Sequence, residues 1–144
     1  MGNRAVISFQ DSSESILDTS QVGIYLHWNG GIESIEAFCQ AASALGVNEP
    51  ARFIQMIGNW FGGNSSVYVD VIKNLDYDNG DNGTYVISKA SRKWKVVQRF
   101  YADLEYKVNG HDEHVREMTQ DVVNVNVGTF VTGGGEDAIS SSST

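Results

Sequence analysis

The sequence predicts an α+β domain in which a mainly antiparallel sheet of about five strands is backed by two helices, with a further helix towards the C-terminus. Two observations lead to this fold class. Segments in which apolar and polar residues alternate lie before and after a central region whose apolar residues recur at helical spacing. In addition, the order is strand, strand, helix, helix and then three strands, which is typical of an antiparallel sheet with its helices grouped on one face.

The expected strands are residues 4–9, 22–28, 67–72, 84–88 and 89–101. In the second of them, the alternating residues from Val22 to Trp28 are expected to face the core, with Tyr25 and His27 on the other face. A turn follows at 29–31. A loop rich in Asp, Asn and Gly, residues 74–83, joins the third strand to the fourth, and a turn at 88–91 precedes the fifth.

Two helices are expected between the second and third strands. The first covers about 32–45, because apolar residues recur there at helical spacing and Gly46 is placed to end it. Pro50 fits the first turn of the second helix, Asn48 is a candidate cap, and Gly62 closes it. A third helix is expected at 111–123. It is short and has few apolar residues, so it is a candidate for packing against a second protomer.

The chain of 144 residues fits one binding domain, residues 1–127, followed by a Gly- and Ser-rich tail at 128–144 with the composition of a disordered segment. Cys39 is the only cysteine, and its place in a helical pattern predicts a buried thiol in a reduced compartment rather than a nucleophile. We find no secretion signal and no long apolar run, so we expect a soluble, cytoplasmic protein that does not enter a membrane.

A net charge of −8 argues against binding of duplex nucleic acid, which requires many phosphate contacts. One segment differs from this acidic background. Residues 89–101 hold five of the ten basic residues, and no Asp or Glu lies between Asp81 and Asp103. The alternation places Trp94, Val96 and Phe100 on one face of this strand and Lys93, Lys95, Val97, Arg99 and Tyr101 on the other. The segment is therefore a candidate anion site, and the alternative is a solvated edge strand, where lysines discourage pairing.

Arginine is the natural donor for phosphate oxygens, because its planar guanidinium binds them in a bidentate manner. A cyclic or diphosphate-containing nucleotide also needs an aromatic face for its base and amide or imidazole groups for its hydroxyls and base edges. The predicted ligand-binding set provides all three chemistries: Arg99 and Arg92 for phosphate, Lys95 for charge, Asn82, Asn29 and His27 for polar edges, and Trp60 or Tyr101 for stacking. Taken singly, each aromatic residue also fits a core position.

Other kinds of site fit the sequence less well. Asp76, Asp78 and Asp81 are reminiscent of a calcium loop, but Asp81 and Ile87 stand where the helix-loop-helix pattern requires Gly and Glu. The acidic and histidine residues of 111–117 are too few for a zinc site, so no metal and no cofactor is expected. A small hydrolase is disfavoured, because no nucleophile-elbow or phosphate-loop motif occurs.

Three phrases of the sequence resemble a known family: Gly-Ile-Tyr-Leu-His-Trp-Asn-Gly-Gly (23–31), Ile-Gly-Asn-Trp-Phe-Gly-Gly (57–63) and Asn-Leu-Asp-Tyr-Asp-Asn-Gly-Asp-Asn-Gly-Thr-Tyr-Val-Ile (74–87). They are similar to small phage and prophage proteins, and among these to the anti-Thoeris sponges, which sequester the cyclic ADP-ribose signals of bacterial TIR-domain immune enzymes. The resemblance covers residues 4–101.

This resemblance implies a phage protein without enzymatic activity, acting in the cytoplasm of an infected cell. It implies that the cyclic nucleotide is bound intact between two protomers of a homodimer or a higher homo-oligomer, and it points to Asn82 and Arg99 as binding residues. The alternative from a different class is a phage inhibitor that binds a host defence protein directly, as an acidic mimic or in the manner of an anti-CRISPR protein. Its acidic residues would be Asp76, Asp78, Asp81, Asp103 and Glu105.

Overall fold

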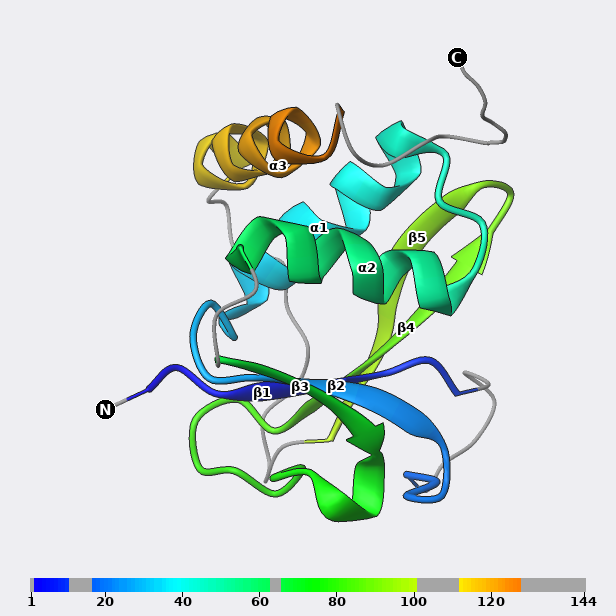
Figure 1. The fold of residues 1–144 in the computed structure, drawn as a ribbon, viewed down its shortest axis with the longest axis vertical. Helices are drawn as coiled ribbons and strands as arrows, with labels where there is room; N and C mark the ends of the chain where they lie inside the picture. The colour runs from blue at the N-terminus through cyan, green and yellow to red at the C-terminus, as the bar shows by residue number, and fades with distance from the viewer. Residues whose placement is uncertain (1, 11–16, 63–65, 101–111, 128–144) are drawn as a thin grey trace.

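The structure is a computed structural model, and it describes residues 2–10, 17–62, 66–100 and 112–127. The elements in this part of the chain are, in order, β1 (Ala5–Ser8), β2 (Val22–Leu26), α1 (Ile32–Leu45), α2 (Pro50–Phe61), β3 (Val67–Val71), the short 3-10 helix η1 (Ile72–Asn74), β4 (Thr84–Ala90), β5 (Lys93–Phe100) and α3 (Asp112–Val127). The three α-helices lie together on one side of a five-stranded sheet (Figure 1). The α+β prediction is therefore confirmed, whereas the predicted tail at 128–144 and Tyr101 lie outside the described residues.

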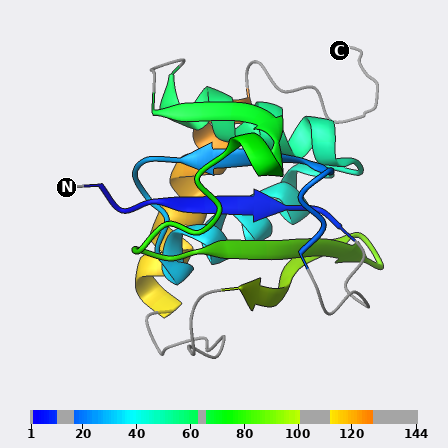
Figure 2. The same ribbon diagram turned by 90° about the horizontal axis from the view of Figure 1, so that it is seen from below.

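The strands follow the order β3-β2-β1-β4-β5 across the sheet, as Figure 2 shows from one edge to the other. β1 pairs in parallel with β4, and the other pairings are antiparallel. The parallel register joins Val6 to Thr84, so β1 and β4 begin at the same end of the sheet. β2 and β5 run the other way and end there. This end of the sheet is called the β1/β4 end below.

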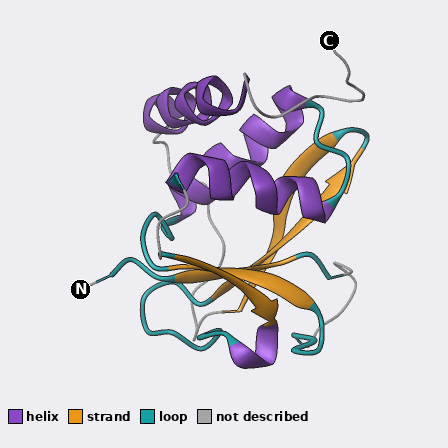
Figure 3. Cartoon of the chain, viewed as in Figure 1, coloured by secondary structure: helices purple, strands orange, loops and turns teal. Residues whose placement is uncertain are grey.

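The main core lies between the sheet and the helices, which Figure 3 shows as two separate layers. Ile7, Ile24 and Tyr85 of the sheet are fully buried in the same cluster as Phe38 and Phe53 of the helices. Burial of such apolar side chains is the main favourable contribution to folding. A smaller cluster occupies the opposite face of the sheet and contains Val6, Tyr25 and Ile72.

Trp94 joins β5 to the region where α1 ends. Its indole Nε1–H donates to the backbone oxygen of Val47 at 2.8 Å, and its backbone N–H donates to Ser43 Oγ at 2.9 Å. The indole also makes an edge-to-face contact with Phe53, with 5.0 Å between ring centroids. The one polar atom of the indole, Nε1, thus has a hydrogen-bond acceptor inside an apolar environment, as a buried tryptophan requires.

The helix boundaries follow from local backbone chemistry. Gly46 and Gly62 end α1 and α2 in the left-handed conformation, with φ of 74° and 69°, which glycine adopts without a steric penalty. Pro50 opens α2 as predicted, but the cap residue is Glu49 rather than Asn48, and no side chain caps the helix. The fixed φ of proline therefore begins this helix without help from Asn48.

The packed face of β2 is shorter than predicted. Ile24 and Leu26 are buried, but Val22 is 51% exposed and Trp28 is 45% exposed. The strand ends at Leu26, before Asn29 takes a positive φ of 60° and turns the chain towards α1. Trp28 therefore lies outside the sheet, and Val22 pairs with the last residue of the edge strand β3, beyond the cover of the helices. The prediction that both residues pack in the core is wrong.

The β4–β5 hairpin differs from the prediction in its turn and in its faces. Ser91 and Arg92 form the turn with φ of 53° and 70°, the positive values that a tight two-residue hairpin requires, so β4 extends to Ala90, into the predicted 88–91 turn. A bulge interrupts the ladder between Val86 and Ile87, and beyond it Arg99 pairs with Tyr85. An extra residue in a strand reverses the alternation. Arg99 therefore lies on the face of Trp94 and not, as predicted, on the opposite face, and Phe100 changes face with it.

Helix α3 packs on its own chain. Val122 is fully buried in the main core, and the buried Asn126 donates to the backbone oxygen of Met56 at 3.3 Å and accepts from Asn59 at 2.9 Å. The helix extends to Val127, four residues beyond the predicted end at 123. The helix therefore contributes more to the core of its own chain than expected, through its contacts with α1 and α2, and its packing on a second protomer stays a prediction. None of the described helices is long and apolar enough to cross a membrane.

Candidate functional site

The loop before β4 is organised by the side chain of Asn79, which is only 3% exposed. Its Oδ1 accepts from the backbone N–H groups of Asp81, Asn82 and Gly83 at 3.2, 2.9 and 2.9 Å. Its Nδ2 donates to the backbone oxygens of Asp76 and Gly83 at 2.9 and 3.1 Å. One amide thus closes the loop, as asparagine does in turns by bonding to nearby backbone groups.

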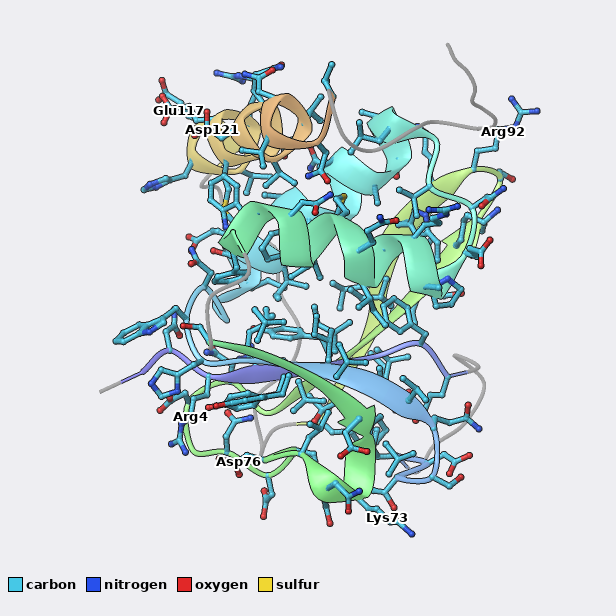
Figure 4. The ribbon with its side chains drawn as sticks, in the orientation of Figure 1. Arg4, Lys73, Asp76, Arg92, Glu117 and Asp121 are labelled. Carbon is cyan, nitrogen blue, oxygen red and sulfur yellow. The ribbon has the colours of Figure 1, made fainter. Side chains whose placement is uncertain are left out.

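Arg4 fixes this loop to the start of β1. Its Nε donates to Asp81 Oδ2 at 2.9 Å and its Nη1 donates to Asp76 Oδ2 at 2.9 Å, and Figure 4 shows Arg4 and Asp76 side by side. The hydrogen bond from Arg4 lowers the pKa of Asp81, and the same bond raises the pKa of Arg4. The positive charge of Arg4 is therefore matched by two carboxylates of its own chain.

Asn82 joins β1 to β5 at the β1/β4 end. Its Nδ2 donates to Asn3 Oδ1 at 2.6 Å and to the backbone oxygen of Arg4 at 2.9 Å. Its backbone oxygen accepts from Arg99 Nε at 3.1 Å, and its Oδ1 accepts from Arg99 Nη2 at 3.3 Å. Asn82 and Arg99, the two residues to which the resemblance points, are therefore in direct contact.

Arg99 is half-buried and is held on two sides. Its guanidinium carbon lies 4.7 Å from the centroid of the Tyr85 ring, within the range of a cation–π interaction. The contacts with Asn82 hold the same group along one edge. A guanidinium that is already oriented loses less conformational freedom when it binds an anion, which favours binding.

His27 lies at the same end of the sheet. Its backbone oxygen accepts from the N–H of Asn3 at 2.8 Å, and Asn3 in turn contacts Asn82. Its Nδ1 is 2.9 Å from the hydroxyl of Tyr25, and its ring meets the exposed Trp28 edge-to-face, with 5.0 Å between centroids. The structure therefore brings three of the predicted residues, His27, Asn82 and Arg99, to one end of the sheet.

Asn29 and Trp60 line a different cavity, of about 330 Å³, between α1, α2 and α3. The other lining residues are Glu33, Ser34, His114, Glu117, Met118 and Asp121, and Figure 4 shows Glu117 and Asp121 on α3, far from Arg4. The Nδ2 of Asn29 donates to Ser34 Oγ at 3.5 Å. Three carboxylates around this cavity make it unsuited to a phosphate, so these two residues do not join the Arg99 cluster.

Arg92 and Lys95 lie towards the opposite end of the sheet. Arg92 is in the exposed hairpin turn, and Figure 4 shows it across the molecule from Arg4. Because a strand rises roughly 3.3 Å per residue, Arg92 is on the order of 20 Å from Arg99, too far for both to hold one small ligand. Lys95 is exposed opposite Ser88 in the same hairpin. The basic strand therefore does not form one continuous phosphate site.

The alternatives of metal binding and nucleophilic catalysis find no support in the described part of the chain. No group of three or more His, Cys, Asp or Glu side chains is suitably placed to hold a metal ion there. Asp76 and Asp81 bind Arg4 instead. Cys39 is fully buried, and burial raises the pKa of its thiol well above the usual value, so the reactive thiolate is disfavoured.

The sequence interpretation missed four residues that build this site: Asn3, Arg4, Asn79 and Tyr85. Asn79 precedes Gly83 by four positions in the segment Asn-Gly-Asp-Asn-Gly, and such a spacing is the available signal for an asparagine that closes a loop on its own backbone. Tyr85 reaches Arg99 only through strand pairing, and Asn3 and Arg4 reach the loop only through the parallel pairing of β1 with β4.

The fold and this site define an α+β protein with an oriented arginine, surrounded by amides and aromatic rings, at one end of its sheet. Comparison of the chain with protein-family models, with curated proteins and with solved structures gave no match.

Proposed function

We propose that this protein binds and sequesters a small cyclic nucleotide signal, a cyclic ADP-ribose isomer, without cleaving it. In this role it is a phage-encoded protein of immune evasion that acts in the cytoplasm of an infected cell. The observation that carries the proposal is the guanidinium of Arg99, which Asn82 and Tyr85 hold in a fixed orientation at the β1/β4 end.

The chemistry of such a ligand fits the groups around Arg99. A diphosphate presents planar sets of oxygens that a guanidinium binds in a bidentate manner. The amide of Asn3 contacts Asn82, and His27 is bonded to Asn3 through its backbone oxygen, so this amide and the imidazole of His27 can bind ribose hydroxyls or base edges. The exposed indole of Trp28, next to His27, offers a face on which a base can stack.

Charge supports a site that two chains share. Arg4 is paired with Asp76 and Asp81, and we assign the phosphate to the guanidinium of Arg99. A diphosphate carries about two negative charges, and electrostatic complementarity requires a second cation close to it. A second copy of the chain would supply another Arg99. We therefore propose a homodimer or a higher homo-oligomer with the ligand between protomers.

Isothermal titration calorimetry with cyclic ADP-ribose isomers tests this function. We expect the wild-type protein to bind one isomer and Arg99→Glu to lose at least a hundredfold in affinity, because the change removes a charge-assisted bidentate contact and adds a repulsive charge. Arg52→Glu is the matched control, since Arg52 is exposed in the first turn of α2 and its side chain donates to Gln55 Oε1 at 2.8 Å. Mass spectrometry of the ligand released by heating should recover it intact.

Three outcomes would contradict the proposal: no binding of any isomer, an equal loss of affinity in both variants, or recovery of a cleaved product. Protection of phage by Arg99→Glu, in a cell that carries the TIR-domain system, would instead favour the alternative of direct binding to a host protein.

A further inference from the structure

A second surface lies on the β3 edge of the sheet, opposite the edge formed by β5 (Figure 2). Four strand spacings separate β3 from β5, which is roughly 19 Å. The β3 edge is therefore far from Arg99, and the inference below does not depend on the proposed nucleotide function.

Strand register shows which backbone groups of β3 point outwards. The N–H of His27 donates to Ser66 O at 2.9 Å, and the N–H of Ile72 donates to Gln21 O at 2.8 Å. In an antiparallel ladder, residues that bond to the neighbouring strand alternate with residues that point away from it. Tyr68 and Asp70 therefore bond to β2, and Val67, Val69 and Val71 direct their N–H and C=O groups away from the sheet.

One of these outward groups is already used within the chain. The N–H of Val71 donates to Asp70 Oδ1 at 2.6 Å. Within the described residues, the N–H and C=O groups of Val67 and Val69 make no such contact. Together they offer two donors and two acceptors in a row, which is the pattern that an added β-strand recognises.

The side chains along this edge are unusually apolar for an exposed strand. Val69 is 53% exposed, and it shares the helix-side face with Val22 of β2. Tyr68 is 55% exposed on the other face, where its ring stacks on Tyr25 with 5.7 Å between centroids. Exposed apolar residues that adjoin one another are typical of an interaction surface.

A cavity of about 590 Å³ opens beside this strand on the tyrosine face. It is lined by Tyr25, Val67, Tyr68, Val69, Asp70, Asn74, Leu75 and Asp76. The carboxylate of Asp70 and an exposed tyrosine ring favour a cationic side chain, since lysine or arginine can pair with this carboxylate and lie against the ring. Asp70 makes both of its contacts through Oδ1, which leaves Oδ2 for such a cation within the described structure.

We propose that the β3 edge binds an extended segment of another protein, in which aliphatic residues alternate with lysine or arginine. The backbone of the segment pairs with Val67 and Val69 as a sixth strand. Its aliphatic side chains pack on Val69, and its basic side chains enter the cavity towards Asp70. A second copy of this chain fits less well, because each copy carries a net charge of −8 and would bring further acidic residues to the cavity.

A blocked heptapeptide of alternating valine and lysine, labelled with a fluorophore, tests this surface by fluorescence anisotropy at 150 mM salt. We expect wild-type protein to bind it and to bind a valine–glutamate peptide of the same length at least tenfold more weakly. Val69→Pro removes one outward N–H and leaves the ladder to β2 intact, as proline does on edge strands. It should weaken binding about tenfold, because a backbone hydrogen bond is lost and the ring obstructs the added strand.

Asp70→Asn provides a test that leaves the backbone unchanged, because asparagine retains Oδ1 for the N–H of Val71. It should weaken binding of the valine–lysine peptide about fivefold. Asp78→Asn, at an exposed aspartate that does not line the cavity, changes the net charge equally and should have no effect.

Four results would overturn the proposal. The first is no binding of the peptide to the wild-type protein. The second is unchanged binding by a folded Val69→Pro, and the third is an equal effect of the two aspartate substitutions. The fourth is a wild-type dimer that Val69→Pro converts to a monomer, because the edge would then be occupied by a second copy.

Discussion

Replacement of Asn79 by alanine is the perturbation that most directly tests how the loop before β4 is built. The substitution removes five hydrogen bonds at once. Two of them, both to Gly83, are buried, and the other three are partly accessible to water. The backbone oxygen of Gly83 keeps a second donor, the N–H of Val6 at 2.9 Å. The N–H of Gly83 is therefore the group left buried without its acceptor.

These contacts set the magnitude of the expected effect. A buried polar group that loses its partner costs about 1–3 kcal/mol, and each hydrogen bond that water can replace costs about 0.5 kcal/mol. We therefore expect Asn79→Ala to lower the free energy of unfolding by about 3 kcal/mol. For a chain of this size, that lowers Tm by roughly 10 °C.

Urea unfolding followed by circular dichroism measures this change. Asn124→Ala is the matched control, because Asn124 is exposed on α3 and its side chain accepts from Gln120 at 2.9 Å on the surface. The free energy of unfolding of this variant should stay within about 0.5 kcal/mol of the wild type. A loss below about 1 kcal/mol for Asn79→Ala would refute the reasoning, since the loop would then keep its shape without the central amide.

Two further substitutions test other parts of the structure. Asp81 has a lowered pKa because Arg4 donates a hydrogen bond to its carboxylate. The pair therefore stabilises the fold at pH values above the pKa of an aspartate in the unfolded chain, about 3.9. This stabilisation is lost as the pH falls through the lower pKa that Asp81 has in the folded protein. Asp81→Asn should therefore make the free energy of unfolding less dependent on pH below about 4 in urea titrations, and an unchanged dependence would exclude the pair. Trp94→Phe leaves Val47 O without its donor and should cost about 2 kcal/mol, whereas a neutral result would show that the buried hydrogen bond contributes nothing.

The fold could be predicted from the sequence where local chemistry decides the structure. α1 was predicted at 32–45 and is found at Ile32–Leu45, because Gly46 ends it with a positive φ. The predicted strands all occur, with boundaries that differ by up to four residues. The faces of β5 could not be predicted beyond Val96, because the bulge depends on how β5 pairs with Val86 and Ile87, which no local pattern encodes.

The candidate site was predicted only in part, for a related reason. Arg92, Lys95 and Arg99 are close in sequence, but each residue of an extended strand adds roughly 3.3 Å to the distance along it, so Arg92 lies far from Arg99. The resemblance points to Asn82 and Arg99 together, and the structure shows these two residues in contact. Asn29 is close in sequence to His27, but its side chain bonds to Ser34 of α1, and both Asn29 and Trp60 line the other cavity between the helices.

The parallel pairing of β1 with β4 explains why the site exists at all. It brings the start of β1 beside the loop before β4, so that Arg4 bonds to Asp81 and Asn3 bonds to Asn82 across more than 70 residues of sequence. An antiparallel β4 would start at the far end of β1, roughly 13 Å away for a four-residue strand, beyond the reach of these contacts. The antiparallel return of β5 then places Arg99 at the same end, where Asn82 is already fixed. The orientation of Arg99 therefore depends on the one parallel pairing in the described sheet, and a substitution that loosens Arg4 from Asp81 should weaken binding of the proposed nucleotide in calorimetry without contacting it.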